Sequence, residues 1–254
     1  MALSPLPVLL ASSVDDVDAG ASASGQTTET LTYTVLDENG EVATRAVFVA
    51  GIPHGPLSVF HRPGVPAMEA DYRLGAAHGT MRSYDENGQV LQEAQREAGV
   101  AEGLTRTYYP SGKLMHEQRY LHGVRNGEAV AFAESGDVSS RSNYLAGRLE
   151  GDASYFNEGR LVLRERYRGG LRDGEALAYA PSGGVAQSSH YRSNLLHGPM
   201  KKFWPDGQLM EETLYRIGKP VGQIRRFDAS GHEITVTAAP AGFMKSLEQL
   251  VRGG

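Results

Sequence analysis

The chain is predicted to fold as an all-β protein: an elongated single-layer antiparallel sheet of about nine β-hairpin repeats with a short C-terminal capping helix. Three periodic features predict it. Glycine recurs every 24 residues, with a single spacing of 23, and pairs of glycines recur with the same period. Aromatic residues occupy two fixed places in each period. A fixed period between about 20 and 50 residues is typical of repeat arrays, in which each unit contacts only its neighbours.

The first set of glycines is predicted to close hairpin turns. Most follow a short segment rich in Asp, Pro, Asn or Ser, such as Asp37–Gly40, Asp85–Gly88 or Pro205–Gly207. Glycine takes a positive φ without steric cost, so such a segment indicates a tight turn between two strands. The nine glycines of this set are Gly40, Gly64, Gly88, Gly112, Gly136, Gly159, Gly183, Gly207 and Gly231.

The glycine pairs have the form Gly-x-x-x-Gly and are predicted to be the turns at the opposite ends of the strands. The first pair is Gly51 and Gly55, and Asn194 replaces the first glycine of the pair that ends at Gly198. Two turns in each period of 24 residues leave about seven residues for each strand, which is near the usual length.

Two columns of aromatic residues run through the repeats. One stands four residues before the turn glycine, as Tyr84 and Tyr108 do, and the other stands eight residues after it, as Tyr72 and Tyr120 do. The exceptions are Leu36 in the first column and Arg96 in the second. Neighbouring strands lie about 4.8 Å apart, so residues at matching positions become cross-strand neighbours. We therefore expect both columns to stack along one face and to form the core of the array.

The repeats are expected to occupy residues 31–239, between two segments of different character. Residues 1–30 are predicted to be a flexible N-terminal segment, because 15–30 are mostly Ser, Ala, Gly, Asp and Thr. Residues 240–254 place Phe243, Met244, Leu247, Leu250 and Val251 at helical spacing. This pattern predicts an amphipathic helix that covers the exposed edge of the last repeat, with docking onto a partner as the alternative.

Composition disfavours several classes of protein. The formal net charge of −5 lacks the basic excess of a nucleic-acid binder, so no nucleic-acid partner is expected. The absence of cysteine rules out disulfides and thiolate metal sites and favours a cytoplasmic location over a periplasmic one. The apolar run at residues 6–11 is short and has no basic residue before it, which is unlike a secretory signal.

No constellation of residues predicts catalysis, a cofactor or a metal ion. His54, His78 and His197 share one repeat position, but equivalent positions in adjacent repeats lie about 9–10 Å apart, too far to bind one zinc ion. Glu69, Glu93, Glu117 and Glu212 recur five residues after a turn glycine, where other repeats have arginine, which indicates cross-strand ion pairs rather than an acid–base pair. We therefore expect a protein that is not an enzyme.

Candidate binding residues are those that depart from the repeat. Tyr109, Phe156 and Trp204 directly follow the residue four before the turn glycine, so a regular strand would place them on the opposite face. Tryptophan and tyrosine are common anchors of protein interfaces. Four further candidates form a basic zone in the last two repeats that would suit an acidic partner: Lys201, Lys202, Arg225 and Arg226.

The repeat resembles the MORN repeat (membrane occupation and recognition nexus), most closely the bacterial variant of the YwqK-family antitoxins. The segments YLHGVRNGEAVAF and YRGGLRDGEALAY carry the pattern, and KKFWPDGQLMEETLYRIGKPVG adds the turn and the second strand. The resemblance covers about residues 31–234. It implies a repeat sheet that binds a protein or sometimes a lipid, and it brings no catalytic residue.

The resemblance suggests an antitoxin, or the immunity protein of a secreted effector, which neutralises a toxin encoded nearby by direct binding. The alternative is a scaffold protein that associates with membrane lipid headgroups, which the acidic net charge disfavours. Recognition of choline in cell walls is a third reading, but choline cages favour tryptophan and the chain has only one. The sequence leaves the partner, the binding face and the oligomeric state open.

Overall fold

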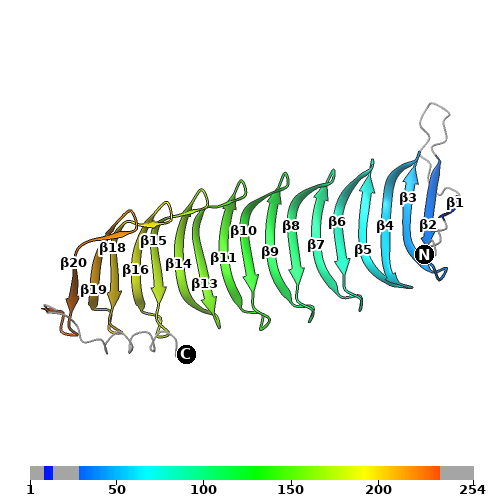
Figure 1. The fold of residues 1–254 in the computed structure, drawn as a ribbon. Coiled ribbons are helices and arrows are strands. Elements are labelled where there is room, and N and C mark those ends of the chain that lie inside the picture. Colours follow the sequence, from blue (N-terminus) through cyan, green and yellow to red (C-terminus); the bar gives the residue numbers. More distant parts are fainter. Residues whose placement is uncertain (1–8, 14–28, 235–254) are drawn as a thin grey trace, which may run out of the picture. The chain divides into compact units, whose positions relative to one another are not determined.

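The computed structural model describes residues 9–13 and 29–234, in two compact units that comprise residues 1–150 and 151–254. The predicted capping helix at 240–254 and the last residues of the predicted array, 235–239, lie outside the described residues. The described residues form strands and turns, with no helix, and the strands pair antiparallel in consecutive hairpins (Figure 1). The short strands β12 and β17 pair only with the strand before them. The predicted all-β architecture of antiparallel hairpins is confirmed.

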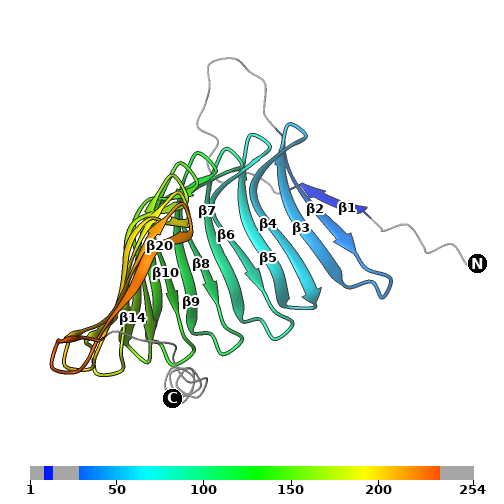
Figure 2. The ribbon, with the colours of Figure 1, turned by 60° about the vertical axis from the view of Figure 1, so that its left-hand side comes forward.

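Unit 1 contains twelve described strands. They are β1 Leu9–Ser13, β2 Thr30–Leu36, β3 Val42–Val49, β4 Ile52–Arg62, β5 Val65–Arg73, β6 Ala76–Tyr84, β7 Val90–Glu97, β8 Val100–Tyr108, β9 Leu114–Leu121, β10 Val124–Phe132, β11 Val138–Leu145 and β12 Arg148–Leu149. The long strands are curved rather than straight (Figure 2).

Unit 2 continues the same pattern of hairpins. Its described strands are β13 Gly151–Asn157, β14 Arg160–Arg168, β15 Leu171–Tyr179, β16 Val185–Arg192, β17 Leu195–Leu196, β18 Gly198–Phe203, β19 Leu209–Arg216, β20 Lys219–Phe227 and β21 Glu233–Ile234.

Strand β1 lies within the segment that was predicted to be flexible. It pairs antiparallel with β2 from Leu9 opposite Val35 to Ser13 opposite Leu31. The edge of a sheet presents unpaired backbone N–H and C=O groups, and an added strand satisfies them. Residues 9–13 are therefore part of the sheet of unit 1, which composition did not indicate.

Seven of the nine turns of the first glycine set have the predicted geometry, and those at Gly64 and Gly159 are two-residue turns. In the first hairpin the Gly40 N–H donates to the Asp37 carbonyl at 3.1 Å, and the Asp37 N–H donates to the Glu41 carbonyl at 2.8 Å. The Asp37 carboxylate accepts the Asn39 N–H at 2.8 Å, and Gly40 has a φ of 82°. A left-handed glycine after a short turn is what the Asp-x-x-Gly pattern indicated.

The glycine pairs are not single turns. Only the first glycine of each pair lies in the turn, as the second residue of a two-residue connection in which both residues have positive φ, for example Leu74 (51°) and Gly75 (83°). The second glycine lies inside the following strand, where the register shifts by a bulge, as between β5 and β6 next to Gly79. The prediction that the whole Gly-x-x-x-Gly segment forms the turn was wrong, because a two-residue turn suffices and the second glycine accommodates a bend.

The two aromatic columns lie on opposite faces, and the prediction of one shared face was wrong. Tyr84 pairs with Val90, whereas Ser83 pairs with Gln92, so one extra residue forms a bulge on β7 beside the turn. The bulge changes which side chains on the two strands share a face next to the turn. The hydroxyl of Tyr84 donates to Glu69 at 2.5 Å, whereas Tyr72 shares its face with the buried Ala70. We call these two surfaces the glutamate face and the alanine face.

Equivalent positions of successive repeats lie on the same face, so the names glutamate face and alanine face apply within each unit. The glutamate face carries Glu69, Glu93 and Glu117 in unit 1 and Glu212 in unit 2, and the alanine face carries Ala46, Ala70 and Ala94 in unit 1 and Ala153 and Ala176 in unit 2.

The core of the sheet is a column that the sequence analysis did not recognise. It stands six residues after each turn glycine and consists of Ala46, Ala70, Ala94, Gln118, Ser142, Glu165, Ser189 and Thr213, all buried except the half-buried Ser142. Small side chains suit most of this column, because the described residues form a single layer in which only neighbouring side chains can cover it.

Glu165 is the ionisable exception in this column, at 8% exposure. Its carboxylate accepts the Tyr167 hydroxyl at 2.7 Å and lies 3.3 Å from a guanidinium nitrogen of Arg172, whose guanidinium stacks 4.3 Å over the Tyr191 ring. Burial raises the pKa of Tyr167, and the hydrogen bond to Glu165 raises it further. The charge of Glu165 is therefore satisfied within the alanine face.

Candidate functional site

Tyr109 and Trp204 join adjacent hairpins. Each stands three residues before a turn glycine, at the start of the turn. The Tyr109 hydroxyl donates to the Phe132 carbonyl at 2.8 Å, and the Trp204 Nε1–H donates to the Phe227 carbonyl at 3.3 Å. Both side chains are half-buried. These two candidates thus bridge each turn to the next hairpin, a role that also accounts for their departure from the usual turn residues.

We expect Trp204→Phe to lower the free energy of unfolding by about 1 kcal/mol, because one hydrogen bond to a backbone carbonyl is lost while most of the ring contact is kept. Tyr109→Phe should have a similar effect in unit 1. Thermal unfolding followed by circular dichroism measures both. Unchanged stability in both variants would show that the bridges do not hold the hairpins.

Phe156 does not depart from the repeat. It pairs with Leu161 as Tyr84 pairs with Val90, so it occupies the aromatic column of the glutamate face, and Tyr155 lies on the alanine face. The spacing of 23 residues arises because this hairpin has a two-residue turn, Glu158 and Gly159, with φ of 50° and 74°. Counting back from the turn glycine therefore misplaced both aromatics by one residue.

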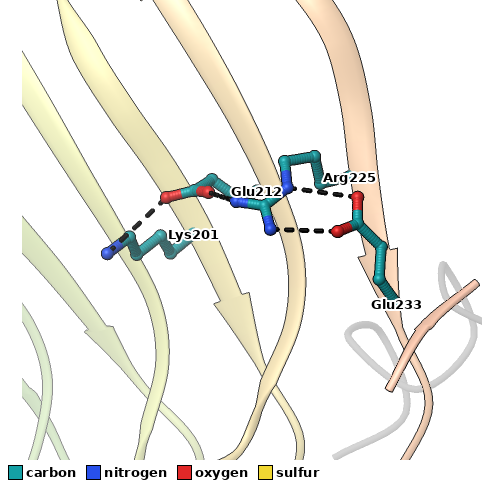
Figure 3. Close-up of polar contacts among 4 residues, drawn as sticks. All are labelled: Lys201, Glu212, Arg225 and Glu233. Atoms are coloured by element: carbon teal, nitrogen blue, oxygen red, sulfur yellow. Dashed lines mark hydrogen bonds and ion pairs between the residues drawn. The ribbon is translucent and has the colours of Figure 1, made fainter. Parts of the chain in front are cut away.

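The predicted basic zone is split between the two faces and is neutralised by carboxylates. On the glutamate face, Lys201 lies 3.6 Å from Glu212, and Arg225 lies 3.0 Å from both Glu212 and Glu233 (Figure 3). On the alanine face, Lys202 and Arg226 each lie 3.0 Å from Glu211. The four cations thus form two cross-strand ladders rather than one basic surface.

Glu211 is expected to make stability depend on acid pH. Its partial burial raises the pKa, but the hydrogen bonds from Arg226 and Lys202 outweigh this, so the pKa is lowered. A carboxyl whose pKa is lowered by folding stabilises the protein above its unfolded pKa, about 4.3, and this contribution is lost as pH falls through the folded value. Glu211→Gln should weaken the loss of stability that occurs as pH falls from about 5 to about 3, measured by urea denaturation. An identical pH profile in the variant would contradict this.

Unneutralised cations gather instead at the two-residue turns of unit 2. Arg192 pairs with Leu195 across the turn at Ser193, and Arg216 pairs with Lys219 across the next turn. All three cations are exposed and have no ion-pair partner among the described residues. In the preceding turn Arg168 pairs with Leu171 and lies 3.6 Å from Asp173. We call this surface, residues 168–171, 192–195 and 216–219, the cationic edge.

Exposed apolar side chains alternate with these cations. Ile217 is 65% exposed, Leu195 is 46% exposed and Leu171 is 43% exposed. The turns are tied to one another, since the Asn194 N–H donates to the Arg172 carbonyl at 2.9 Å and the Gly218 N–H donates to the Leu196 carbonyl at 2.8 Å. Equivalent residues of adjacent turns lie two strand spacings apart, about 9.6 Å. The cationic edge is therefore a rigid row of mixed charged and apolar groups.

Unit 2 also has a groove on the glutamate face, lined by residues of β15, β16 and β18. Strands β15 and β16 pair Leu177 with Ser188. At the equivalent repeat positions of unit 1, β6 and β7 pair Arg82 with Glu93, whose Nε and Oε1 atoms lie 2.8 Å apart. The groove has a volume of about 470 Å³. Its lining consists of Glu175, Leu177, Val185, Ser188, His190, Pro199, Lys201, Phe203 and Gly207. Leu177 and Phe203 give this groove an apolar lining beside the charged Glu175 and Lys201.

Sequence reasoning missed this surface because it compared residues with the turn glycines of the first set. Arg168, Arg192 and Arg216 stand two residues before the first residue of each Gly-x-x-x-Gly segment or its Asn194 equivalent. At the same position unit 1 has Val49, Arg73, Glu97, Leu121 and Leu145. A comparison of that column would have shown that it is basic throughout unit 2 and mixed in unit 1.

Among residues 9–13 and 29–234, no three His, Cys, Asp or Glu side chains gather closely enough to hold a metal ion. Within the same residues, no helix has the length and apolar character that a membrane span requires.

Three hairpins match a known repeat family. Residues 77–97, 101–122 and 196–216 match the family described as MORN repeat variant. These segments correspond to the hairpins β6–β7, β8–β9 and β18–β19. No curated protein matches the chain significantly.

Proposed function

We propose that this MORN-repeat protein is a non-enzymatic binding protein that neutralises a partner toxin or effector by direct contact, as an antitoxin or immunity protein does. The observation that supports this most is the cationic edge of unit 2. Contiguous exposed groups that are apolar and rimmed by polar residues mark interaction surfaces. At these adjacent turns Arg192, Arg216 and Lys219 have no ion-pair partner among the described residues.

The chemistry of this surface defines the partner. An acidic protein surface satisfies the three unpaired cations, and an apolar side chain on that surface fits the groove beside Leu177 and Phe203. A fixed spacing of about 9.6 Å between turns favours a folded partner, whose carboxylates are held at fixed distances. The two faces of the sheet elsewhere carry mutually satisfied ion pairs, such as that of Arg106 with Glu117 at 2.9 Å, which are weaker candidates for binding.

The function is tested by co-expression with the products of adjacent genes. We expect one product to arrest growth when expressed alone, growth to be restored by this protein, and the two purified proteins to form a complex. If no adjacent product binds the full chain and deletion of its gene leaves cells unharmed, the proposal is wrong.

Association with anionic lipid headgroups is a second candidate, because the cationic edge combines exposed apolar tips such as Ile217 with unpaired cations. The formal net charge of −5 opposes it. Flotation of the full chain with phosphatidylserine vesicles, compared with neutral phosphatidylcholine vesicles, distinguishes the two candidates. Flotation only with the anionic vesicles would favour the membrane function.

A further inference from the structure

The first four two-residue turns of the Gly-x-x-x-Gly segments in unit 1 form an exposed, largely apolar strip, which we call the apolar edge: residues 49–52, 73–76, 97–100 and 121–124. Its apolar side chains are unusually accessible. Leu74 is 76% exposed, Ile52 and Val124 are each 47% exposed, and Val100 is 45% exposed. Contiguous apolar surface of this kind marks an interface.

The turns of the apolar edge are held in register. The N–H groups of Gly75, Gly99 and Gly123 each donate to a carbonyl of the preceding hairpin, at 2.9, 2.7 and 2.9 Å. Across each turn the flanking residues are paired, for example Val49 with Ile52 and Leu121 with Val124. Four such turns, at about 9.6 Å from one to the next, extend about 29 Å. The strip is a preformed surface.

Two charges of opposite sign stand in the middle of this strip. Arg73 flanks the second turn and Glu97 flanks the third, and both are exposed. Neither has an ion-pair partner among the described residues. The outer turns carry the apolar residues Val49, Ile52, Leu121 and Val124 at the equivalent positions.

We propose that the apolar edge binds a second copy of this chain about a two-fold axis between the second and third turns. In that arrangement Arg73 of each copy meets Glu97 of the other. The first turn meets the fourth, where the apolar Leu121 and Val124 flank the exposed His122. A two-fold axis through the second turn would place Arg73 of one copy opposite Arg73 of the other. An axis through the third turn would do the same with Glu97. Like charges placed opposite each other oppose association, so charge selects the register.

The contact is small. A strip of four turns is expected to bury less surface than a standard stable interface, which favours a weak dimer whose population depends on concentration. Its formation does not depend on the partner of the cationic edge, which belongs to unit 2.

Sedimentation equilibrium of the purified full chain, over about 1–100 μM, tests the dimer. The expected result is a concentration-dependent dimer that Leu74→Asp, Arg73→Glu and Glu97→Arg each weaken at least tenfold. The double variant Arg73→Glu/Glu97→Arg should restore it, because the two charges are exchanged. Leu145→Asp is the matched control, since Leu145 is 59% exposed but lies in the next turn, beyond the four.

Circular dichroism establishes that each variant is folded. A chain that is monomeric at every concentration overturns the proposal, as does a dimer that survives both Leu74→Asp and Arg73→Glu. Failure of the double variant to restore the dimer overturns the proposed register.

Discussion

Gly174→Ala should lower the free energy of unfolding by about 2–3 kcal/mol, although it adds a single methyl group. Gly174 is the second glycine of its pair and lies within β15 at the bulge, with a φ of 126°. A Cβ at this position would lie 2.9 Å from Cδ and 3.1 Å from Cβ of Arg166 on the neighbouring strand. The substitution therefore combines a backbone conformation that side chains disfavour with a close approach between strands.

Two neighbouring glycines separate these causes. Gly183 has a φ of 87°, but a methyl group added there would have no atom within 4 Å, so Gly183→Ala should cost only the backbone strain, about 1 kcal/mol. Gly184 has no positive φ and its nearest neighbour is Ser182 Oγ at 3.8 Å, so Gly184→Ala should be close to neutral.

Urea denaturation followed by the fluorescence of Trp204 measures the series, because the single tryptophan of the chain lies in unit 2 with all three glycines. Equal losses for Gly174→Ala and Gly183→Ala would show that the approach of Arg166 contributes nothing. A neutral Gly174→Ala would show that the bulge does not require glycine.

Gly174 illustrates which features of the fold the sequence predicts and which it does not. The period and the Asp-x-x-Gly turns sufficed for the hairpins, because a turn is a local feature with a strong residue preference. The role of Gly174 could not be inferred from Gly-x-x-x-Gly alone, since the spacing is compatible with a long turn or with a short turn followed by a bulge. Only the pairing of β14 with β15 distinguishes them.

Errors about the faces followed from the bulges. Side chains alternate along a regular strand, but a bulge shifts the alternation by one residue. Tyr84 and Tyr72 therefore lie on two faces rather than on the one that the sequence predicts. The error about Phe156 has another cause, the two-residue turn at Glu158 and Gly159 that shortens its repeat by one residue.

The candidate site was predicted only in part, because its contacts depend on how the strands are paired. Lys201, Glu212 and Arg225 are separated by 11–13 residues, so their ion pairs become visible only when the register of β18, β19 and β20 is known. A cluster of cations in the sequence is not a basic surface until its cross-strand neighbours are identified.

Reversing two charges of the cationic edge, with Arg192→Glu and Arg216→Glu together, should weaken binding of the neutralised partner by at least about 100-fold, or 2.7 kcal/mol. Both side chains are exposed and have no ion-pair partner among the described residues, so their replacement leaves the fold intact. Against an acidic partner, each substitution removes an attraction and adds a repulsion.

The matched control reverses two exposed arginines away from the edge, Arg45→Glu and Arg119→Glu, which changes the net charge equally. If binding depends on the row of turns rather than on total charge, the control keeps its affinity within about threefold. Isothermal titration at low and high salt gives the decisive comparison. The affinity of the native protein should fall with salt more steeply than that of the edge variant, because screening acts on the charges that the variant has lost. Equal losses in the edge variant and the control would show that the partner responds to the overall charge of the chain, and the assignment of the cationic edge as the binding surface would then be wrong.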